Sequence, residues 1–125
     1  MILLKHMDKS RNKSTGNLGE DKACEFLEST GYKIIDRNLK LICGEIDILA
    51  QDKKSLVIVE VKSVRGSGFG TAQELVRYRK QNKLKQLARA LEQQYPNRTI
   101  RIDVVGVEIG WDGEVEVEHL INCVN

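Results

Sequence analysis

The stretch that decides the fold runs from Gly44 to Lys62. It reads Gly44-Glu45-Ile46-Asp47-Ile48-Leu49-Ala50, then Gln51-Asp52-Lys53-Lys54-Ser55, then Leu56-Val57-Ile58-Val59-Glu60-Val61-Lys62. Two apolar runs rich in β-branched residues flank a short polar turn, a pattern typical of a β-hairpin. Because side chains alternate along a strand, Glu60 and Lys62 share a face. A turn centred between Lys53 and Lys54 places Asp47 opposite Glu60 on that face, with their Cβ atoms roughly 4.5–5.5 Å apart.

The expected Asp47–Glu60 pair brings two like charges together at the end of an apolar strand. Such carboxylates repel each other unless a cation compensates them. Carboxylate oxygens are the ligands that Mg²⁺ and Mn²⁺ prefer, so the pair predicts a divalent metal site. Lys62 could then hold a water or a phosphate oxygen. The alternative is an ordinary salt bridge at the strand end, because charge clusters are common on proteins.

The rest of the chain predicts one α/β domain around this hairpin. Leu56–Val59 is apolar at every position, which favours a mixed sheet covered by helices on both faces. A helix that follows the third strand should return the next strand parallel to it. Residues 1–16 are basic and rich in turn formers, and we expect a mobile arm there, followed by a single domain over residues 17–125. The expected elements are a helix over 19–29, a strand over 32–42 interrupted near 36–38, the hairpin, a helix over 71–94, and strands over 99–109 and 114–121.

The pattern Asp47, then Glu60-x-Lys62, resembles the D…(D/E)-x-K signature of restriction-endonuclease-like nucleases. A longer series resembles the YraN-like family of predicted nucleases, which is itself similar to archaeal Holliday-junction resolvases. That resemblance covers roughly residues 16–110 and implies a restriction-endonuclease-like core of order αβββαβ, here with an extra C-terminal strand. The series consists of Gly19-Glu20, Gly31-Tyr32, Arg37-Asn38, Gly44–Ile48, Val59–Lys62, Phe69-Gly70, Lys80-Gln81 and Arg101–Val105.

The resemblance implies metal-dependent hydrolysis of DNA phosphodiester bonds, on branched or damaged DNA in repair or recombination. Mg²⁺ or Mn²⁺ held by Asp47, Glu60 and the Val61 carbonyl would polarise the phosphoryl oxygen and activate a water. Lys62 would orient that water or stabilise the developing charge. Glu20 would be a third acid near the metal, holding a metal-bound water. It is equally well explained as a first-turn glutamate that the helix dipole favours.

The net charge of +2 hides a strong asymmetry along the chain. Residues 71–95 hold six Lys/Arg against two acids, whereas residues 96–125 hold two against six. The basic segment could meet a polyanion, and the acidic C-terminal segment would face away from it. Arg65, Lys80 and Lys83 are the expected phosphate contacts, with Lys85 off their face. Aromatic residues are few and scattered, so backbone and shape recognition is expected rather than base reading.

Two other functions stay open, a non-catalytic nucleic-acid-binding module and a protein-interaction domain on the same fold. DNA is the expected partner, and the sequence leaves open whether the chain forms a homodimer. No stretch approaches the length of a membrane span. Three widely spaced cysteines favour a reducing compartment, so we expect a cytoplasmic protein. A zinc site that joins these cysteines with His119 lacks the usual paired C-x-x-C spacing.

Overall fold

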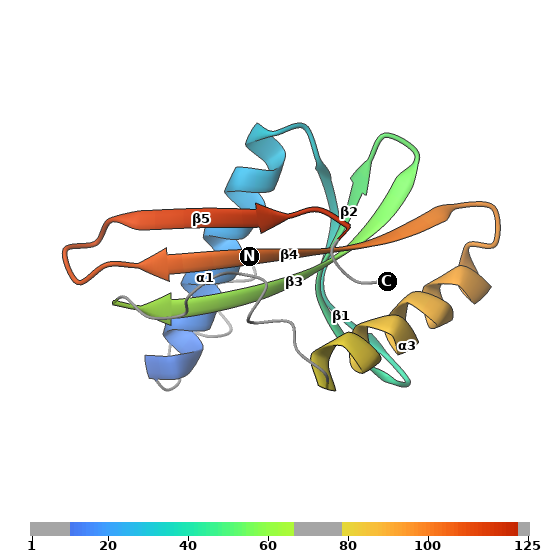
Figure 1. Ribbon diagram of the computed structural model, residues 1–125, viewed down its shortest axis with the longest axis horizontal. Coiled ribbons are helices and arrows are strands. Elements are labelled where there is room, and N and C mark those ends of the chain that lie inside the picture. The colour runs from blue at the N-terminus through green and yellow to red at the C-terminus, as the bar shows by residue number, and fades with distance from the viewer. Residues whose placement is uncertain (1–10, 67–78, 123–125) are drawn as a thin grey trace.

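A computed structural model describes residues 11–66 and 79–122 of the chain, with the side chains of 11–16, 79 and 80 left out. The described elements follow the predicted order of one helix, three strands, a helix and two strands (Figure 1). They are α1 (Arg11–Ser29), β1 (Lys33–Leu41), β2 (Gly44–Asp52), β3 (Ser55–Arg65), α3 (Arg79–Gln94), β4 (Thr99–Ile109) and β5 (Val115–Leu120).

The strands form a single five-stranded mixed sheet in the order β1-β2-β3-β4-β5. Strands β3 and β4 are parallel, and the other three pairs are antiparallel. The segment that contains α3 links β3 to β4, and such a crossover returns the chain in the same direction. The α/β fold class and the parallel step are therefore confirmed.

The core consists of two layers, one on each face of the sheet. Leu56 and Ile58 of β3 pack with Leu84 and neighbouring leucines of α3. Val57 and Val59 point the other way and pack with α1. Figure 1 shows the two helices on opposite sides of the sheet. Coverage from both sides explains why four consecutive β3 residues are apolar, and it confirms the prediction made from them.

The hairpin turn lies where the sequence predicts it. Asp52 pairs with Ser55, so Lys53 and Lys54 form a two-residue turn, with Lys53 at a φ of 56°. Two-residue hairpin turns require left-handed backbone, because its twist matches the twist of the strands. The resulting register pairs Ile48 with Val59. Asp47 and Glu60, which are predicted from the sequence to pair, lie one residue beyond this last pair of the ladder.

Three expected boundaries differ in the structure or lie outside the described residues. Helix α1 begins at Arg11 rather than Gly19, so it extends into the segment expected to be a mobile arm. Residues 1–10 lie outside the described residues, and the division into arm and domain stays a prediction. The same holds for residues 71–78 at the start of the long helix. The first strand is continuous, with a register shift between Ile34 and Asp36. Over the described ranges, no helix is long and apolar enough to cross a membrane.

Candidate active site

Strands β2 and β3 stop pairing near the predicted acid–lysine cluster. Their ladder ends at Ile48 and Val59, while β3 stays paired with β4 as far as Arg65. Asp47 lies one residue beyond the last ladder pair and reaches across to β3. The backbone N–H of Val61 donates a hydrogen bond to Oδ2 of Asp47 over 2.9 Å. This contact fixes the carboxylate of β2 beside the triplet Glu60-Val61-Lys62.

Alternation along β3 assigns each residue of the triplet to a face of the sheet. Leu56 and Ile58 pack on the α3 side, so Glu60 and Lys62 also point to that side. Val61 points the other way and packs with the α1 cluster. Glu60 is half buried and Lys62 is exposed. An exposed lysine beside two half-buried carboxylates suits a site that receives an anionic ligand.

Glu20 lies in the middle of α1, nine residues from its described start, and not in the first turn. The helix-dipole explanation for this acid is therefore wrong, because the dipole acts only on the first and last turns. Instead, Arg37 of β1 pairs with it, with Nη2 3.4 Å from Oε1 of Glu20. Burial raises the pKa of Glu20, and the charge and hydrogen bond of Arg37 oppose that rise without cancelling it.

The turn of α1 that carries Glu20 is set directly on β3 by Gly19. A Cβ on Gly19 would stand 1.6 Å from the Oγ of Ser63 and 2.6 Å from its Cβ. Only glycine allows the helix to approach the strand so closely. Since Ser63 follows Lys62, this approach brings Glu20 to the part of the sheet that holds the triplet. Sequence reasoning placed Gly19 in a motif but missed this contact.

The donor atoms near Asp47 fit a hard divalent cation. Asp47 and Glu60 supply carboxylate oxygens from neighbouring strands, and Mg²⁺ commonly takes one or two carboxylates and keeps several waters. Within residues 11–66 and 79–122, no three Asp, Glu, His or Cys side chains lie close enough to hold one ion. A part for Glu20 at the metal, which the family resemblance implies, therefore stays a prediction.

The basic residues proposed for DNA are not all brought together. Lys83 of α3 lies against Gly44 at the start of β2, where a Cβ would stand 2.6 Å from Cε of Lys83. It therefore lies on the same side of the sheet as Lys62. Alternation puts Arg65 on the α1 side, away from Lys62. The side chain of Lys80 lies outside the described residues, so its predicted role stays a prediction.

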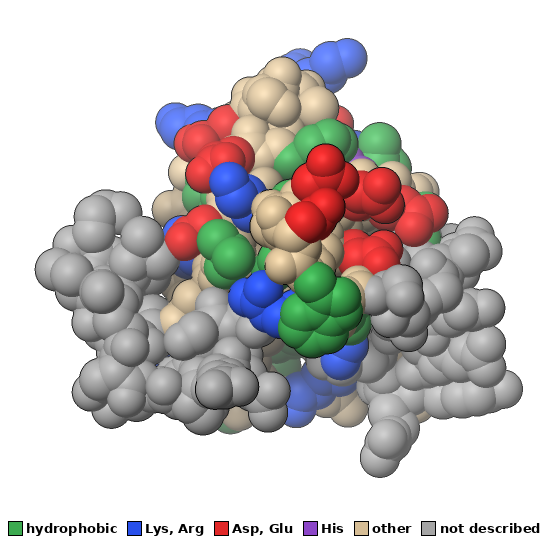
Figure 2. Space-filling model, turned by 90° about the vertical axis from the view of Figure 1, so that its left-hand side faces the viewer, with side chains coloured by type: hydrophobic (Ala, Val, Ile, Leu, Met, Phe, Trp, Pro, Cys, Tyr) green, Lys and Arg blue, Asp and Glu red, His purple; other side chains and the backbone are tan. Residues whose placement is uncertain are grey.

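The acidic C-terminal strands do not face away from the site. Glu108 and Glu116 pair with each other on β4 and β5. Their chain neighbours Val107 and Val117 pack on the α1 side of the sheet. Because side chains alternate along a strand, the two glutamates lie on the α3 side. Figure 2 shows acidic side chains gathered on the side of the molecule that holds the β4–β5 turn. The expectation of an acidic segment turned away is wrong.

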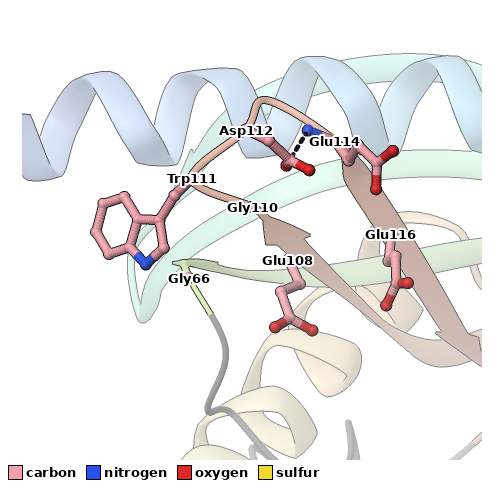
Figure 3. Close-up of a pocket in the computed structure, with 7 residues that line it drawn as sticks. All are labelled: Gly66, Glu108, Gly110, Trp111, Asp112, Glu114 and Glu116. Atoms are coloured by element: carbon pink, nitrogen blue, oxygen red, sulfur yellow. Dashed lines mark hydrogen bonds between the residues drawn. The ribbon is translucent and has the colours of Figure 1, made fainter.

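These acids line a pocket beyond the C-terminal end of β3. Trp111 forms one wall of this pocket. It is 80% exposed, and its indole lies over Gly66. Figure 3 shows Glu108 and Glu116 pointing to the same side of the strands. A polyanion would be repelled here.

Sequence reasoning missed a buried polar network around Asp103 of β4, which is 0% exposed. Its carboxylate accepts hydrogen bonds from the Tyr32 hydroxyl (3.1 Å), Arg101 Nε (3.0 Å) and the Asn122 N–H (2.9 Å). His119 Nε2 lies 2.8 Å away. Burial alone would raise the pKa of Asp103, but these hydrogen bonds outweigh it and lower the pKa. An acid inside the apolar run Ile102–Val105 was the available signal.

Comparison with known proteins gives close relatives and distant structural likenesses. Residues 19–107 match the family described as "Uncharacterised protein family UPF0102". A UPF0102 protein of Desulforamulus reducens is 40% identical over 119 residues, which cover 91% of this chain and 98% of the relative. Another, of Symbiobacterium thermophilum, is 42% identical over 114 residues, covering 90% and 97%.

The solved structures overlap the fold only partly. A structure described as an EndoMS–dsDNA2 complex has a TM-score of 0.45 and 17% identity, over 67% of this chain and 34% of that one. A Pyrococcus furiosus SfsA structure in complex with Ca²⁺ has a TM-score of 0.42 and 17% identity, over 85% and 64%. Overlaps as distant as these assign no activity.

Proposed function

Because this chain belongs to the uncharacterised protein family UPF0102, whose description names no activity, we propose its function from the site: a Mg²⁺- or Mn²⁺-dependent DNA endonuclease. One observation carries the proposal. The N–H of Val61 donates to Asp47 over 2.9 Å, which joins the aspartate of β2 to the Glu60-x-Lys62 triplet of β3. A surface salt bridge would need no such backbone anchor.

Asp47, Glu60 and the Val61 carbonyl would hold the divalent ion. The bound ion would supply a Lewis acid for the phosphoryl oxygen and a lowered pKa for the attacking water. The Val61 N–H keeps the Asp47 carboxylate in one orientation, so little reorganisation is needed when substrate binds. Lys62, exposed on the same face, would stabilise the negative charge that develops on the phosphoryl group.

The distribution of charge supports DNA as the substrate and limits its path. Lys62 and Lys83 lie on the α3 side of the sheet, and phosphates can contact both. Glu108 and Glu116 occupy the same side beyond Lys62. A straight duplex along β3 would run over these acids. We therefore propose a substrate whose strands change direction at the site, as branched or damaged DNA does.

The test is cleavage of linear, flapped and four-way DNA with Mg²⁺, with Mn²⁺ and with EDTA. Wild-type protein should cleave at least one DNA with either metal and none with EDTA. Asp47→Asn and Glu60→Gln should abolish cleavage. Glu92→Gln on α3 removes the same charge from an exposed position, so it serves as the control and should leave the rate unchanged.

Three results would overturn the proposal. The first is cleavage that persists in Asp47→Asn, because it would come from another site or a contaminant. The second is metal-independent DNA binding without cleavage of any substrate, which would favour the non-catalytic binding module. Absence of both cleavage and salt-sensitive DNA binding would leave the protein-interaction domain.

A further inference from the structure

Arg37 of β1 holds two neighbouring acids of α1 at once. Its Nη1 lies 2.9 Å from Oδ1 of Asp21, and its Nη2 lies 3.4 Å from Oε1 of Glu20. The side chains are 12%, 21% and 17% exposed in the order Arg37, Asp21, Glu20. Neighbouring helix positions lie about 100° apart around the axis. One planar guanidinium that spans both carboxylates therefore fixes the rotation of α1 against β1 and the direction of each acid.

The same contacts set Glu20 beside the candidate active site. Arg37 pairs across the sheet with Ile48, the neighbour of Asp47. Asn38, which follows Arg37 and has a φ of 54°, lies near enough to Glu20 to oppose the rise in its pKa that burial causes. The preceding residue, Gly19, brings α1 close to β3. Contacts with β1 and with β3 therefore fix the position of Glu20 near Asp47.

The fork does not satisfy Arg37 itself. Its Nε is buried and finds no acceptor among the residues that the structure describes, which is unfavourable for a donor. The guanidinium is thus oriented for its two carboxylates at the expense of its Nε–H. Of the two carboxylates, Asp21 makes the shorter contact with Arg37. Glu20 makes the longer contact and lies nearer the break between β2 and β3.

We propose that Arg37 is a positioning residue, which directs the Glu20 carboxylate to the break between β2 and β3, where Asp47 lies, so that Glu20 orients a water on the divalent ion. Asp21 is the anchor that keeps the guanidinium in place. This inference rests on the metal site of the proposed function. It requires no direct bond from Glu20 to the ion, in agreement with the two-carboxylate donor set.

Mn²⁺ binding, followed by the EPR signal of the free ion in metal titrations without DNA, tests this assignment. The variants are Arg37→Lys, Glu20→Gln and Asp21→Asn. Arg37→Lys keeps the charge and loses the fork, so it should weaken Mn²⁺ binding about tenfold, as losses of outer partners do. Glu20→Gln should match it. Asp21→Asn removes a negative charge but keeps an oxygen that accepts from Nη1 of Arg37, so the guanidinium stays in place and the affinity should change less than about twofold. Thermal melts confirm that each variant is folded.

A purely electrostatic or structural fork predicts the opposite order. Asp21→Asn would then weaken Mn²⁺ binding more than Arg37→Lys, and this result would overturn the inference while leaving the metal site intact. Wild-type protein that binds no Mn²⁺ would instead overturn the metal site, and the inference with it. On a DNA that the wild type cleaves, Arg37→Lys should lower kcat and leave KM within about twofold, since an oriented water acts on the chemical step.

Discussion

The role proposed for Lys62 predicts that its replacement separates catalysis from DNA binding. Lys62→Ala should lower kcat about 10²-fold or more, the loss seen when one stabilising donor to a developing charge is removed. The Kd for DNA should change little, because this contact strengthens only in the transition state. Lys54→Ala in the turn of the same hairpin is the control, since it removes the same charge from another exposed position. Equal losses in kcat and affinity for Lys62→Ala would make this lysine a plain phosphate anchor.

Asp103 should make the free energy of unfolding depend on pH in the acid range. Its pKa is lowered from the usual 3.8, so its hydrogen bonds add stability above about pH 4. That stability is lost as pH falls through the folded-state pKa. Asp103→Asn should cost at least about 1.5–3 kcal/mol at pH 7, the value of one hydrogen bond to a charged group.

Urea unfolding of wild type and Asp103→Asn between pH 7 and pH 2 measures this difference. The gap in unfolding free energy should stay constant down to about pH 4 and close below it. Glu28→Gln, an exposed acid on α1, should show no such gap. A gap that persisted at pH 2 would mean that the network acts through shape and not through the ionised carboxylate.

Helix α1 packs closely against β3 because residue 19 is a glycine. Gly19→Ala should destabilise the protein by about 1–3 kcal/mol, the usual effect of an added methylene in a packed contact, because the new Cβ meets Ser63 within 2.6 Å. It should also impair cleavage, since Glu20 moves with the helix. The double variant Gly19→Ala with Ser63→Gly removes the clash. The nearest remaining atom, Cα of residue 63, then stands 3.8 Å from the new Cβ, an ordinary contact distance. Melting temperature and kcat should both recover in part.

A double variant no more stable than Gly19→Ala would contradict this account of the packing. Recovery of melting temperature without recovery of kcat would be equally informative. It would mean that the helix position supports the fold but that Glu20 contributes nothing to cleavage.

The elements near the hairpin could be predicted from sequence because their signals are local. Alternation and the Lys53-Lys54 turn fix the register of β2 and β3, and an unbroken apolar run marks a strand covered on both faces. The Arg37–Glu20 contact joins residues 17 positions apart, and the Tyr32–Asp103 bond spans 71 positions. No periodicity links such pairs, so the sequence could name Glu20 as a candidate but could not name its partner.

On the scale of the whole molecule, charge is divided between the two ends of one sheet face. Lys62 and Lys83 lie near the break between β2 and β3, whereas Glu108 and Glu116 lie towards the β4–β5 turn. Segment charges along the sequence divide the chain into basic and acidic portions. They could not predict that both lie on one face, because that depends on the parallel pairing of β3 with β4. DNA should therefore approach from the α3 side at the β2 end of the face.

This approach makes two lysines of α3 unequal. Lys83 lies against Gly44 near the site, whereas Lys85 lies beside Glu92 and Ile102 on another side of the helix. Each duplex phosphate contact lowers the slope of log affinity against log salt by about 0.9. Lys83→Ala should therefore weaken binding across DNA sequences and reduce the magnitude of the slope by about one, and Lys85→Ala should change it less. Fluorescence anisotropy from 50 to 300 mM salt measures the affinity and its salt dependence, in EDTA to prevent cleavage.

The two variants lose the same charge, so equal effects would mean that α3 acts only as a diffuse basic field. Binding that does not depend on salt would mean that DNA phosphates do not contact the site.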